Sequence, residues 1–285
     1  MAAGSGQLTT VPLYGIWGSG PNDVWAVGES GTVQRWNGSA WSALGAGVDN
    51  PVLALAVSAG SVYAGGVFER AGGAAASHIA LWNGSAWSAL GSAGTDGVNN
   101  WVRAIAVSGN DVYVGGNFTA AGGQPANAIA RWNGATWTPL GAGLSGGATA
   151  PPTVAAVAVF AGSIYAAGQF DLAGDQAANS LARWDGARWQ GLGTDNIRQS
   201  VLALGSDATS LYVGGTGLIQ TPLPELLSRS VAGSAADGGS RDTTISRNGA
   251  KISFVSDASN LVAADANGRA DVFVRDPVSG ETIRA

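Results

Sequence analysis

The hexapeptide pattern Trp-Asn-Gly-x-x-Trp limits what this chain can fold into more than any other feature. It begins at Trp36, Trp82 and Trp132, and it returns with Asp in place of Asn at Trp184. Asn-Gly and Asp-Gly favour the positive φ angles of tight turns between antiparallel strands. A connection of two or four residues places both tryptophans on the same face, where their rings can pack. The pattern therefore predicts four β-hairpins, each with an aromatic pair.

A second motif repeats in phase with these hairpins. The four hairpins begin 46, 50 and 52 residues apart. A strand-like segment that carries one tyrosine and ends in glycine recurs at residues 62–66, 112–116, 164–168 and 211–215. A repeat near 50 residues is the length of a kelch-type β-propeller blade, whereas a solenoid uses a shorter repeat.

Each repeat has room for four short strands. In the third repeat they are predicted at residues 102–107, 111–116, 128–132 and 136–140. The first is an apolar run typical of a strand buried on both faces. We therefore predict an all-β fold, a β-propeller of about five to six four-stranded antiparallel blades whose ring is complete, incomplete or a hybrid of two repeat types. Ala and Gly near the axis would let the blades approach closely, and the tryptophans would fill the space near the rim.

The repeat pattern breaks after residue 215, and this break sets the predicted domain organisation. We expect an N-terminal tail at 1–10, propeller blades over 11–220, and a junction rich in Pro, Ser, Gly and Ala at 221–241. A different strand-turn-strand pattern then fills 242–285, with turn signals at Asn248-Gly249 and Ser279-Gly280. This last blade would either complete the same ring or belong to a truncated second one.

Residues 11–215 resemble the kelch-like or delta-60-type propeller repeats of bacterial and fungal proteins. The second repeat carries the whole pattern, with Tyr63-Ala64-Gly65-Gly66, Phe68, Ala71-Gly72-Gly73 and Ile79-Ala80-Leu81-Trp82. The fourth repeat departs from it at Ala167 and Asp175, and the first has no long loop. The resemblance implies a binding or scaffold module.

The C-terminal residues 226–285 are similar to a different family, the TolB-like propellers of bacterial envelope and secreted proteins. The matching segments are Phe254-Val255-Ser256-Asp257-Ala258-Ser259 and Asp271-Val272-Phe273-Val274-Arg275-Asp276. This resemblance also implies a binding or scaffold function, and it points to an extracellular or periplasmic location. The start of the chain lacks the basic and apolar segments of a signal peptide, so we expect any leader to be missing from this sequence.

Composition excludes several classes of function. The net charge is -5, and no run of Lys or Arg is available to neutralise phosphates, so we expect no nucleic-acid partner. No apolar segment is long enough to span a bilayer, so we expect no membrane insertion. The chain has no cysteine and a single histidine, His78, which we expect on the surface or rim. A thiol nucleophile and a histidine-based triad are therefore not predicted.

The Phe-x-x-Ala-Gly-Gly loops are the predicted ligand-binding face, because they recur at one place in three repeats and must line one face of the ring. The variable positions in them supply polar side chains for a protein or carbohydrate partner. The candidate ligand-binding residues are Glu69, Arg70, Thr119, Gln124, Asp171 and Asp175. The alternative is that these loops only join strands.

One segment has the spacing of a cation-binding loop. Asp265, Asn267 and Asp271 place oxygen-bearing side chains at positions one, three and seven of a short loop that contains glycine. This spacing suits calcium, although the bidentate glutamate of an EF-hand is missing. The competing interpretation is that these side chains cap their own backbone turn. Calcium is the single cofactor that the sequence suggests.

These observations predict a non-catalytic β-propeller binding or scaffold module of a bacterial extracellular or envelope protein, with a glycan or peptide ligand. The first alternative is a glycan-active lyase or hydrolase that uses carboxylates such as Asp171 and Asp175. Two carboxylates that converge in a pocket within about 10 Å would favour it. The second alternative is a fragment without a function of its own.

Overall fold

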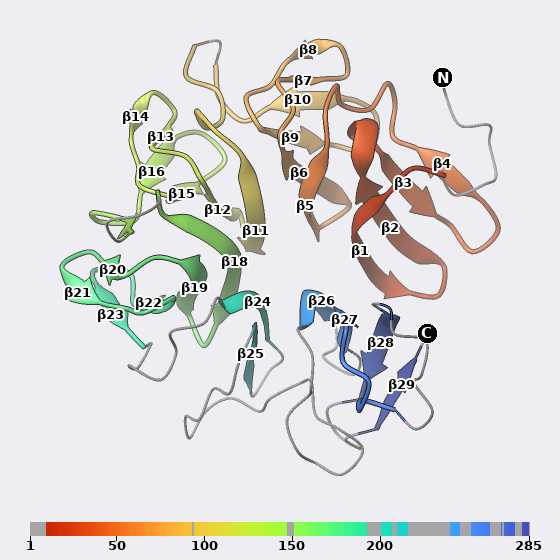
Figure 1. Cartoon of the computed structure of the whole chain (residues 1–285). Helices are drawn as coiled ribbons and strands as arrows, with labels where there is room; N and C mark the ends of the chain where they lie inside the picture. Colours follow the sequence, from red (N-terminus) through yellow and green to blue (C-terminus); the bar gives the residue numbers. More distant parts are fainter. Residues whose placement is uncertain are drawn as a thin grey trace.

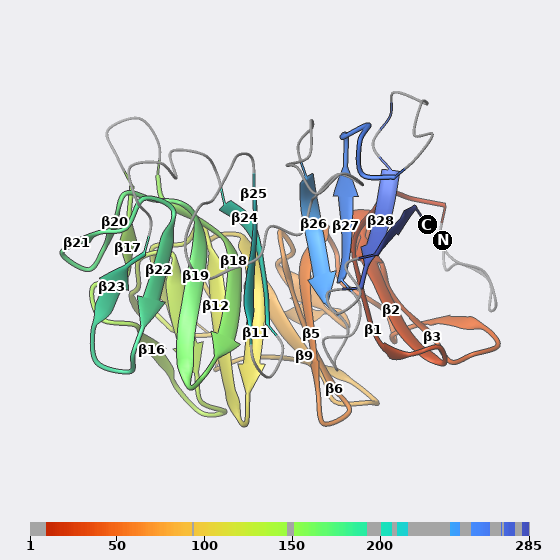
Figure 2. The same ribbon diagram turned by 90° about the horizontal axis from the view of Figure 1, so that it is seen from below.

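The computed structural model describes residues 10–92, 94–146, 151–192, 201–206, 210–215, 240–245, 252–262, 269, 271–276 and 281–284. Antiparallel sheets stand around a common axis, which Figure 1 views end-on and Figure 2 from the side. The fold is a β-propeller, as the repeats predicted. In the described part of the chain, no helix is long and apolar enough to cross a membrane.

Five sheets in the described residues have four strands each, and each sheet is one blade. Blade 1 contains β1 (Leu13–Gly20), β2 (Asp23–Gly28), β3 (Val33–Trp36) and β4 (Trp41–Ala43), with the short 3-10 helix η1 (Glu29–Gly31) between β2 and β3. Blade 2 contains β5 (Val52–Ser58), β6 (Ser61–Gly66), β9 (Ile79–Trp82) and β10 (Trp87–Ala89), and blade 3 contains β11 (Val102–Ser108), β12 (Asp111–Gly116), β15 (Ile129–Trp132) and β16 (Trp137–Pro139). Blade 4 contains β18 (Thr153–Phe160), β19 (Ser163–Gln169), β22 (Leu181–Trp184) and β23 (Trp189–Gly191), and blade 6 contains β26 (Ser240–Ile245), β27 (Ile252–Ser256), β28 (Asp271–Arg275) and β29 (Thr282–Arg284).

Blade 5 is represented by β24 (Val201–Ser206) and β25 (Leu211–Gly215). Small hairpins follow the second strand of blades 2, 3 and 4. They are β7 (Arg70–Ala71) with β8 (Ala74–Ala75), β13 (Ala120–Ala121) with β14 (Gln124–Pro125), and β20 (Leu172–Ala173) with β21 (Gln176–Ala177), the last joined by β17 (Leu144–Ser145).

The innermost strands succeed one another around the ring. In order they are β1, β5, β11, β18, β24 and β26, and each packs on the next. Strand β26 also packs on β1, so the C-terminal blade lies between blades 5 and 1 in the same ring (Figure 1). The predicted domain boundary at 220 falls outside the described residues, and so does the junction apart from residues 240 and 241. These boundaries stay predictions.

The tryptophan hairpins have the predicted pairing and a different turn chemistry. Trp36 pairs directly with Trp41 across a four-residue connection, and their ring centroids lie 5.8 Å apart. Gly38 has φ of 97°, whereas Asn37 is not among the residues with positive φ. Instead, the Oδ1 atom of Asn37 accepts hydrogen bonds from the backbone N–H groups of Ser39 and Ala40. Asn is therefore used for its side-chain acceptor, which corrects the expectation of positive φ at both turn residues.

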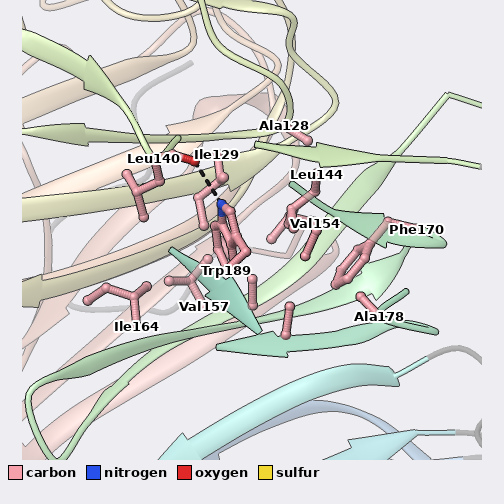
Figure 3. Close-up of a cluster of buried hydrophobic side chains, with 14 residues drawn as sticks. Ala128, Ile129, Leu140, Leu144, Val154, Val157, Ile164, Phe170, Ala178 and Trp189 are labelled. Atoms are coloured by element: carbon pink, nitrogen blue, oxygen red, sulfur yellow. Dashed lines mark hydrogen bonds between the residues drawn. The ribbon is translucent and has the colours of Figure 1, made fainter. Parts of the chain in front are cut away.

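The second tryptophan of each later hairpin joins two blades. The Nε1 atoms of Trp87, Trp137 and Trp189 donate to the carbonyl oxygens of Leu44, Leu90 and Leu140 at 2.8, 2.8 and 2.7 Å. Each acceptor belongs to the preceding blade. Figure 3 shows Trp189 among the buried side chains, with the bond to Leu140 drawn. The tryptophan pairs thus connect blade 4 to 3, 3 to 2 and 2 to 1.

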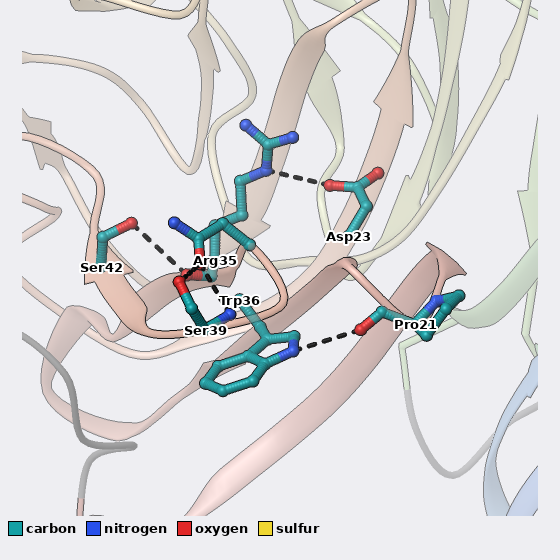
Figure 4. Close-up of polar contacts among 7 residues, drawn as sticks. Pro21, Asp23, Arg35, Trp36, Ser39 and Ser42 are labelled. Carbon is teal, nitrogen blue, oxygen red and sulfur yellow. Dashed lines mark hydrogen bonds and ion pairs between the residues drawn. The ribbon is translucent and has the colours of Figure 1, made fainter.

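Blade 1 uses its tryptophans differently. The Nε1 atom of Trp36 donates to the Pro21 carbonyl at 3.2 Å, and Arg35 pairs with Asp23 at 2.9 Å on the same sheet (Figure 4). For Trp41, which occupies the position of Trp87, no acceptor occurs among the described residues. Among the described residues, Trp41 therefore makes no indole clamp toward the blade that precedes blade 1 in the ring.

At the contact between blades 6 and 1, apolar side chains are more exposed than their counterparts in blades 2 and 3. Ile79 and Ile129 on the third strands of blades 2 and 3 are fully buried. Val272 pairs with the second strand of blade 6 in the same register and is 46% exposed. Across the seam, Ile16 of β1 is 49% exposed. In the described residues, the contact between the C-terminal blade and blade 1 therefore leaves two apolar side chains exposed.

Candidate functional site

The innermost strands enclose a central channel. Each of β1, β5, β11, β18 and β24 is an edge strand of its sheet, and all five line a cavity of 790 Å³. Leu55, Val57, Ile105, Val157 and Leu204 form much of its wall. Because the strands turn their edges to this space, side chains on β5 and β11 are only half-buried. This corrects the expectation that the inner strands are buried on both faces.

A β-bulge occurs at the same place in all five of these strands. The pairing of β11 with β12 shifts between Val102 and Ala104, which leaves Arg103 as the extra residue. The residues at this position in β1, β5, β11, β18 and β24 are Tyr14, Leu53, Arg103, Ala155 and Leu202, and all five line the cavity. A bulge re-aims the side chain of its extra residue. Here it directs one side chain from each strand to one end of the channel.

Arg103 is held in place by a short chain of hydrogen bonds. Its Nε atom donates to Oδ1 of Asn117, and Nδ2 of Asn117 donates to Oγ1 of Thr153 in the next blade at 2.6 Å. The guanidinium carbon lies 5.4 Å from the ring centroid of Trp101, within the range of a cation–π contact. Burial lowers the pKa of the Arg103 guanidinium because it disfavours the charged form.

Blade 1 contributes a second polar pair near this end. The Tyr14 hydroxyl donates to Oε2 of Glu29 in η1. This hydrogen bond is the main cause that raises the pKa of Tyr14, and burial and the Glu29 charge add to it. Apolar walls with a few polar groups at one end are typical of ligand sites.

The predicted loop residues lie elsewhere. The hairpins that carry them pack beside the outermost strands β10, β16 and β23, and Figure 1 shows them at the periphery. Glu69, Arg70, Thr119, Gln124, Asp171 and Asp175 are all exposed, and none lines the cavity. The structure therefore keeps the residues of different blades apart on three separate hairpins.

Several of these loops have a structural role. The Oδ1 atom of Asp49 accepts from the backbone N–H groups of Glu69 and Arg70, both at 3.0 Å. Asn99 does the same for Thr119 in blade 3 at 2.9 Å. The side chain of Asp175 accepts from Nε2 of Gln176. The contacts of Asp49 and Asn99 tie the loops of blades 2 and 3 to the segment that enters their own blade, whereas the contact of Asp175 stays within its hairpin.

The calcium prediction falls mainly outside the described residues. Asp265 and Asn267 are not described, and Asp271 begins β28 with a carboxylate oxygen 3.5 Å from Nη1 of Arg284. Within the described ranges, no three His, Cys, Asp or Glu side chains are grouped as metal ligands would be. Calcium binding by Asp265, Asn267 and Asp271 stays a prediction.

His78 occupies a strained backbone position that recurs in other blades. Its φ is 63°, and Ala128 and Ser180 at the equivalent sites have φ of 62° and 72°. The His78 N–H donates to the Phe68 carbonyl and closes the loop. The ring is half-buried, and its buried Nδ1 atom has no hydrogen-bond partner among the described residues. Burial lowers the pKa of His78, opposed by the nearby Glu69 charge.

This environment predicts a loss of stability in mild acid that depends on His78. The folded pKa lies below the unfolded value of about 6.5. As the pH falls below about 6.5, the unfolded chain binds the proton more readily, so the free energy of unfolding decreases. His78→Ala should reduce this decrease, and Ala is already accepted at position 128. Urea unfolding at pH 7.5 and pH 5.0 measures the effect, and equal decreases in both proteins would contradict it.

Sequence reasoning missed Arg103, Trp101 and Tyr14. The signal was present in the aligned inner strands, where Val52-Leu53-Ala54, Val154-Ala155-Ala156 and Val201-Leu202-Ala203 are apolar and Val102-Arg103-Ala104 carries a charge. A charged residue in a run otherwise selected for burial is the informative exception. The channel that receives it exists only in the assembled ring.

The succession of antiparallel four-stranded sheets around a channel defines a β-propeller, and known structures agree. The WD40 β-propeller domain of Doa1 is 11% identical over 100% of this chain and 86% of its own, with a TM-score of 0.56. YCF48, solved with D1 peptide, is 13% identical over 98% and 83%, with a TM-score of 0.55. The computationally designed Ika8 protein is 19% identical over 97% and 74%, with a TM-score of 0.53.

Comparison by sequence gives no family assignment. No protein-family model matches the chain, and no curated protein matches it. At identities below 20% the structural likeness shows the fold alone. The kelch-like and TolB-like repeat types therefore remain predictions from the motifs.

Proposed function

We propose that this chain is a non-catalytic binding module that holds an extended peptide segment of a partner protein in its central channel. The observation that carries this proposal is the 790 Å³ cavity, with apolar walls and polar side chains at one end. Its volume falls within the range of about 300–1,000 Å³ usual for ligand pockets. One of the structurally similar propellers, YCF48, was solved with a bound peptide, which supports a binding role.

The channel suits an extended chain better than a sugar ring. The five lining strands are edge strands, so their backbone N–H and C=O groups point toward the axis. An extended peptide can pair with such edges and place alternate side chains against the apolar wall. A glycan needs exposed aromatic faces together with many hydrogen-bonding side chains, whereas this wall is built mainly of Leu, Val, Ile and Ala.

The setting of this module is also a proposal. The kelch-like pattern of residues 11–215 and the TolB-like pattern of residues 226–285 support a bacterial extracellular or envelope protein. The polar loop hairpins would then serve to join strands, as the contacts of Asp49 and Asn99 suggest.

The proposed site can be tested by filling the channel. Ala155 lies at the bulge position of blade 4, lines the cavity and is only half-buried, so Ala155→Trp should obstruct the channel with little change in folding. We expect a panel of apolar peptides to bind the native chain in isothermal titration and to lose at least tenfold in affinity to this variant. Unchanged affinity in Ala155→Trp would overturn the channel as the site.

A matched loop variant separates the two candidate faces. Asp171→Asn with Asp175→Asn alters the exposed hairpin of blade 4 and leaves the channel unchanged. We expect this double variant to bind the peptides as the native chain does. Loss of binding in this variant alone would move the site to the loop hairpins. Release of reducing sugar from a glycan panel, abolished by the same variant, would instead favour the enzyme alternative.

A further inference from the structure

We propose that Arg103 and Trp101 form a carboxylate-recognition site at one end of the channel, which makes the preferred ligand an apolar peptide with one anionic group. This inference rests on the proposed function, because it names the chemistry that the channel selects.

The bulge in β11 brings the guanidinium to the channel. Arg103 is the extra residue between Val102 and Ala104, and it is the one lining position in the described strands that carries a positive charge. The corresponding residues Leu53 and Ala155 in the neighbouring blades are apolar. A cation is thus placed at a defined point on a wall built mainly of apolar side chains.

Among the described residues, the hydrogen bonds of Arg103 involve its Nε atom and not its two terminal nitrogens. The Nε atom is used by Asn117, which is itself held by Thr153. Among the described residues no carboxylate pairs with this guanidinium, and its two terminal nitrogens have no acceptor. These nitrogens form the part of the fork that binds a carboxylate in two parallel hydrogen bonds. The anchored Nε keeps the fork in one orientation.

Trp101 adds a second element of recognition. Its indole ring lies against the guanidinium at 5.4 Å and is 41% exposed, although large aromatic side chains are usually more buried. Such a ring holds the plane of the arginine and offers an apolar surface beside the anion. A ligand with a carboxylate next to an apolar side chain would meet both groups.

Electrostatics favours one carboxylate over a more highly charged group. Arg103 is half-buried, so the charged guanidinium is partly desolvated and gains from a counter-ion. The chain as a whole carries a net charge of -5, which repels polyanions. A single monoanionic carboxylate matches the one cation at this site.

The carboxylate has two chemical sources, a peptide C-terminus or an acidic side chain. Three probes of one apolar sequence separate them: acetyl-Leu-Val-Leu-Phe with a free C-terminus, the same peptide as its amide, and the amide with Glu in place of Val. We expect the native chain to bind at least one of the acids about tenfold more tightly than the plain amide in isothermal titration. Whichever acid is preferred identifies the source.

The variants assign that preference to Arg103. Arg103→Met keeps a long apolar side chain, and it should bind the acids and the plain amide equally. Arg131→Met, in the same blade, removes an arginine that pairs with Asp111 and does not line the cavity, so it should keep the preference. An acid preference that persists in Arg103→Met overturns the inference.

The two proposals fail in different ways. If the native chain binds acid and amide equally and Ala155→Trp abolishes both, the channel is the site and the carboxylate inference is wrong. If the native chain binds none of the probes, the proposed peptide-binding function falls, and the inference falls with it.

Discussion

Replacing Trp189 with alanine should lower the free energy of unfolding by about 3–5 kcal/mol, the range for removing a large buried aromatic side chain. Trp189 is 5% exposed and packs in the cluster shared by blades 3 and 4. Its ring centroid lies 5.4 Å from that of Trp184, and its Nε1 donates to Leu140 at 2.7 Å. The substitution removes the packing, the aromatic pair and the hydrogen bond between the blades. Urea unfolding followed by circular dichroism measures the loss.

Phenylalanine variants separate the hydrogen bond from the packing. Trp189→Phe keeps an aromatic ring but removes one of the two donors to the Leu140 carbonyl, which still accepts from the Gly143 N–H. We expect a cost of about 0.5–1.5 kcal/mol, the net contribution of one hydrogen bond. Trp41→Phe is the matched control, because the Nε1 atom of Trp41 has no acceptor among the described residues. We expect Trp41→Phe to cost clearly less than Trp189→Phe. Equal losses would show that the indole clamp contributes no more than ring packing.

Gly116→Ala should destabilise the chain by about 3 kcal/mol, at the upper end of the range for overpacked sites. A Cβ atom at Gly116 would lie 2.0 Å from the carbonyl oxygen of Trp101. Because this neighbour is backbone, no rotamer change can relieve the clash, and β11 must move away from β12. The same close approach occurs at Gly66 and Gly168, so the constraint belongs to the blade design.

Gly20→Ala is the control for this prediction. A Cβ atom at Gly20 meets nothing within 4 Å, and Gly20 is not among the glycines with positive φ. We expect its free energy of unfolding to change by less than about 1 kcal/mol, because only the entropy of the unfolded chain is affected. If Gly116→Ala is tolerated as well as Gly20→Ala, the close approach of Trp101 to Gly116 is not a packing requirement.

The local structure of the repeats could be predicted from the sequence because it depends on near neighbours. Trp36 and Trp41 are five residues apart, and the turn between them is closed by the side chain of Asn37. The strands of blade 3 follow their apolar pattern, and the structure begins β11 at Val102 as expected. Strand alternation and turn chemistry act over a few residues, so a single sequence reveals them.

The candidate site was harder to predict because it is assembled from distant residues. Arg103 lies in an otherwise apolar strand, and it is linked through Asn117 to Thr153, which lies 50 residues further along the chain. The polar loops around Glu69 and Asp171 were predicted as the binding face because they recur at one place in three repeats. In the structure these loops lie at the rim, where they pack beside β10 and β23.

The sequence by itself determined the blades of this protein: the Trp-Asn-Gly-x-x-Trp hairpins, the strand before each Gly-Gly pair and the break after residue 215. Only the tertiary structure decided that β26 packs against both β24 and β1, and that the second indole of blades 2 to 4 donates a hydrogen bond to the preceding blade. It also decided that a bulge directs the Arg103 side chain toward the channel. The physical reason is the separation along the sequence of the residues that make contact. Hairpins form from contacts a few residues apart, whereas the channel and the contacts between blades exist only after the sheets have packed around a common axis.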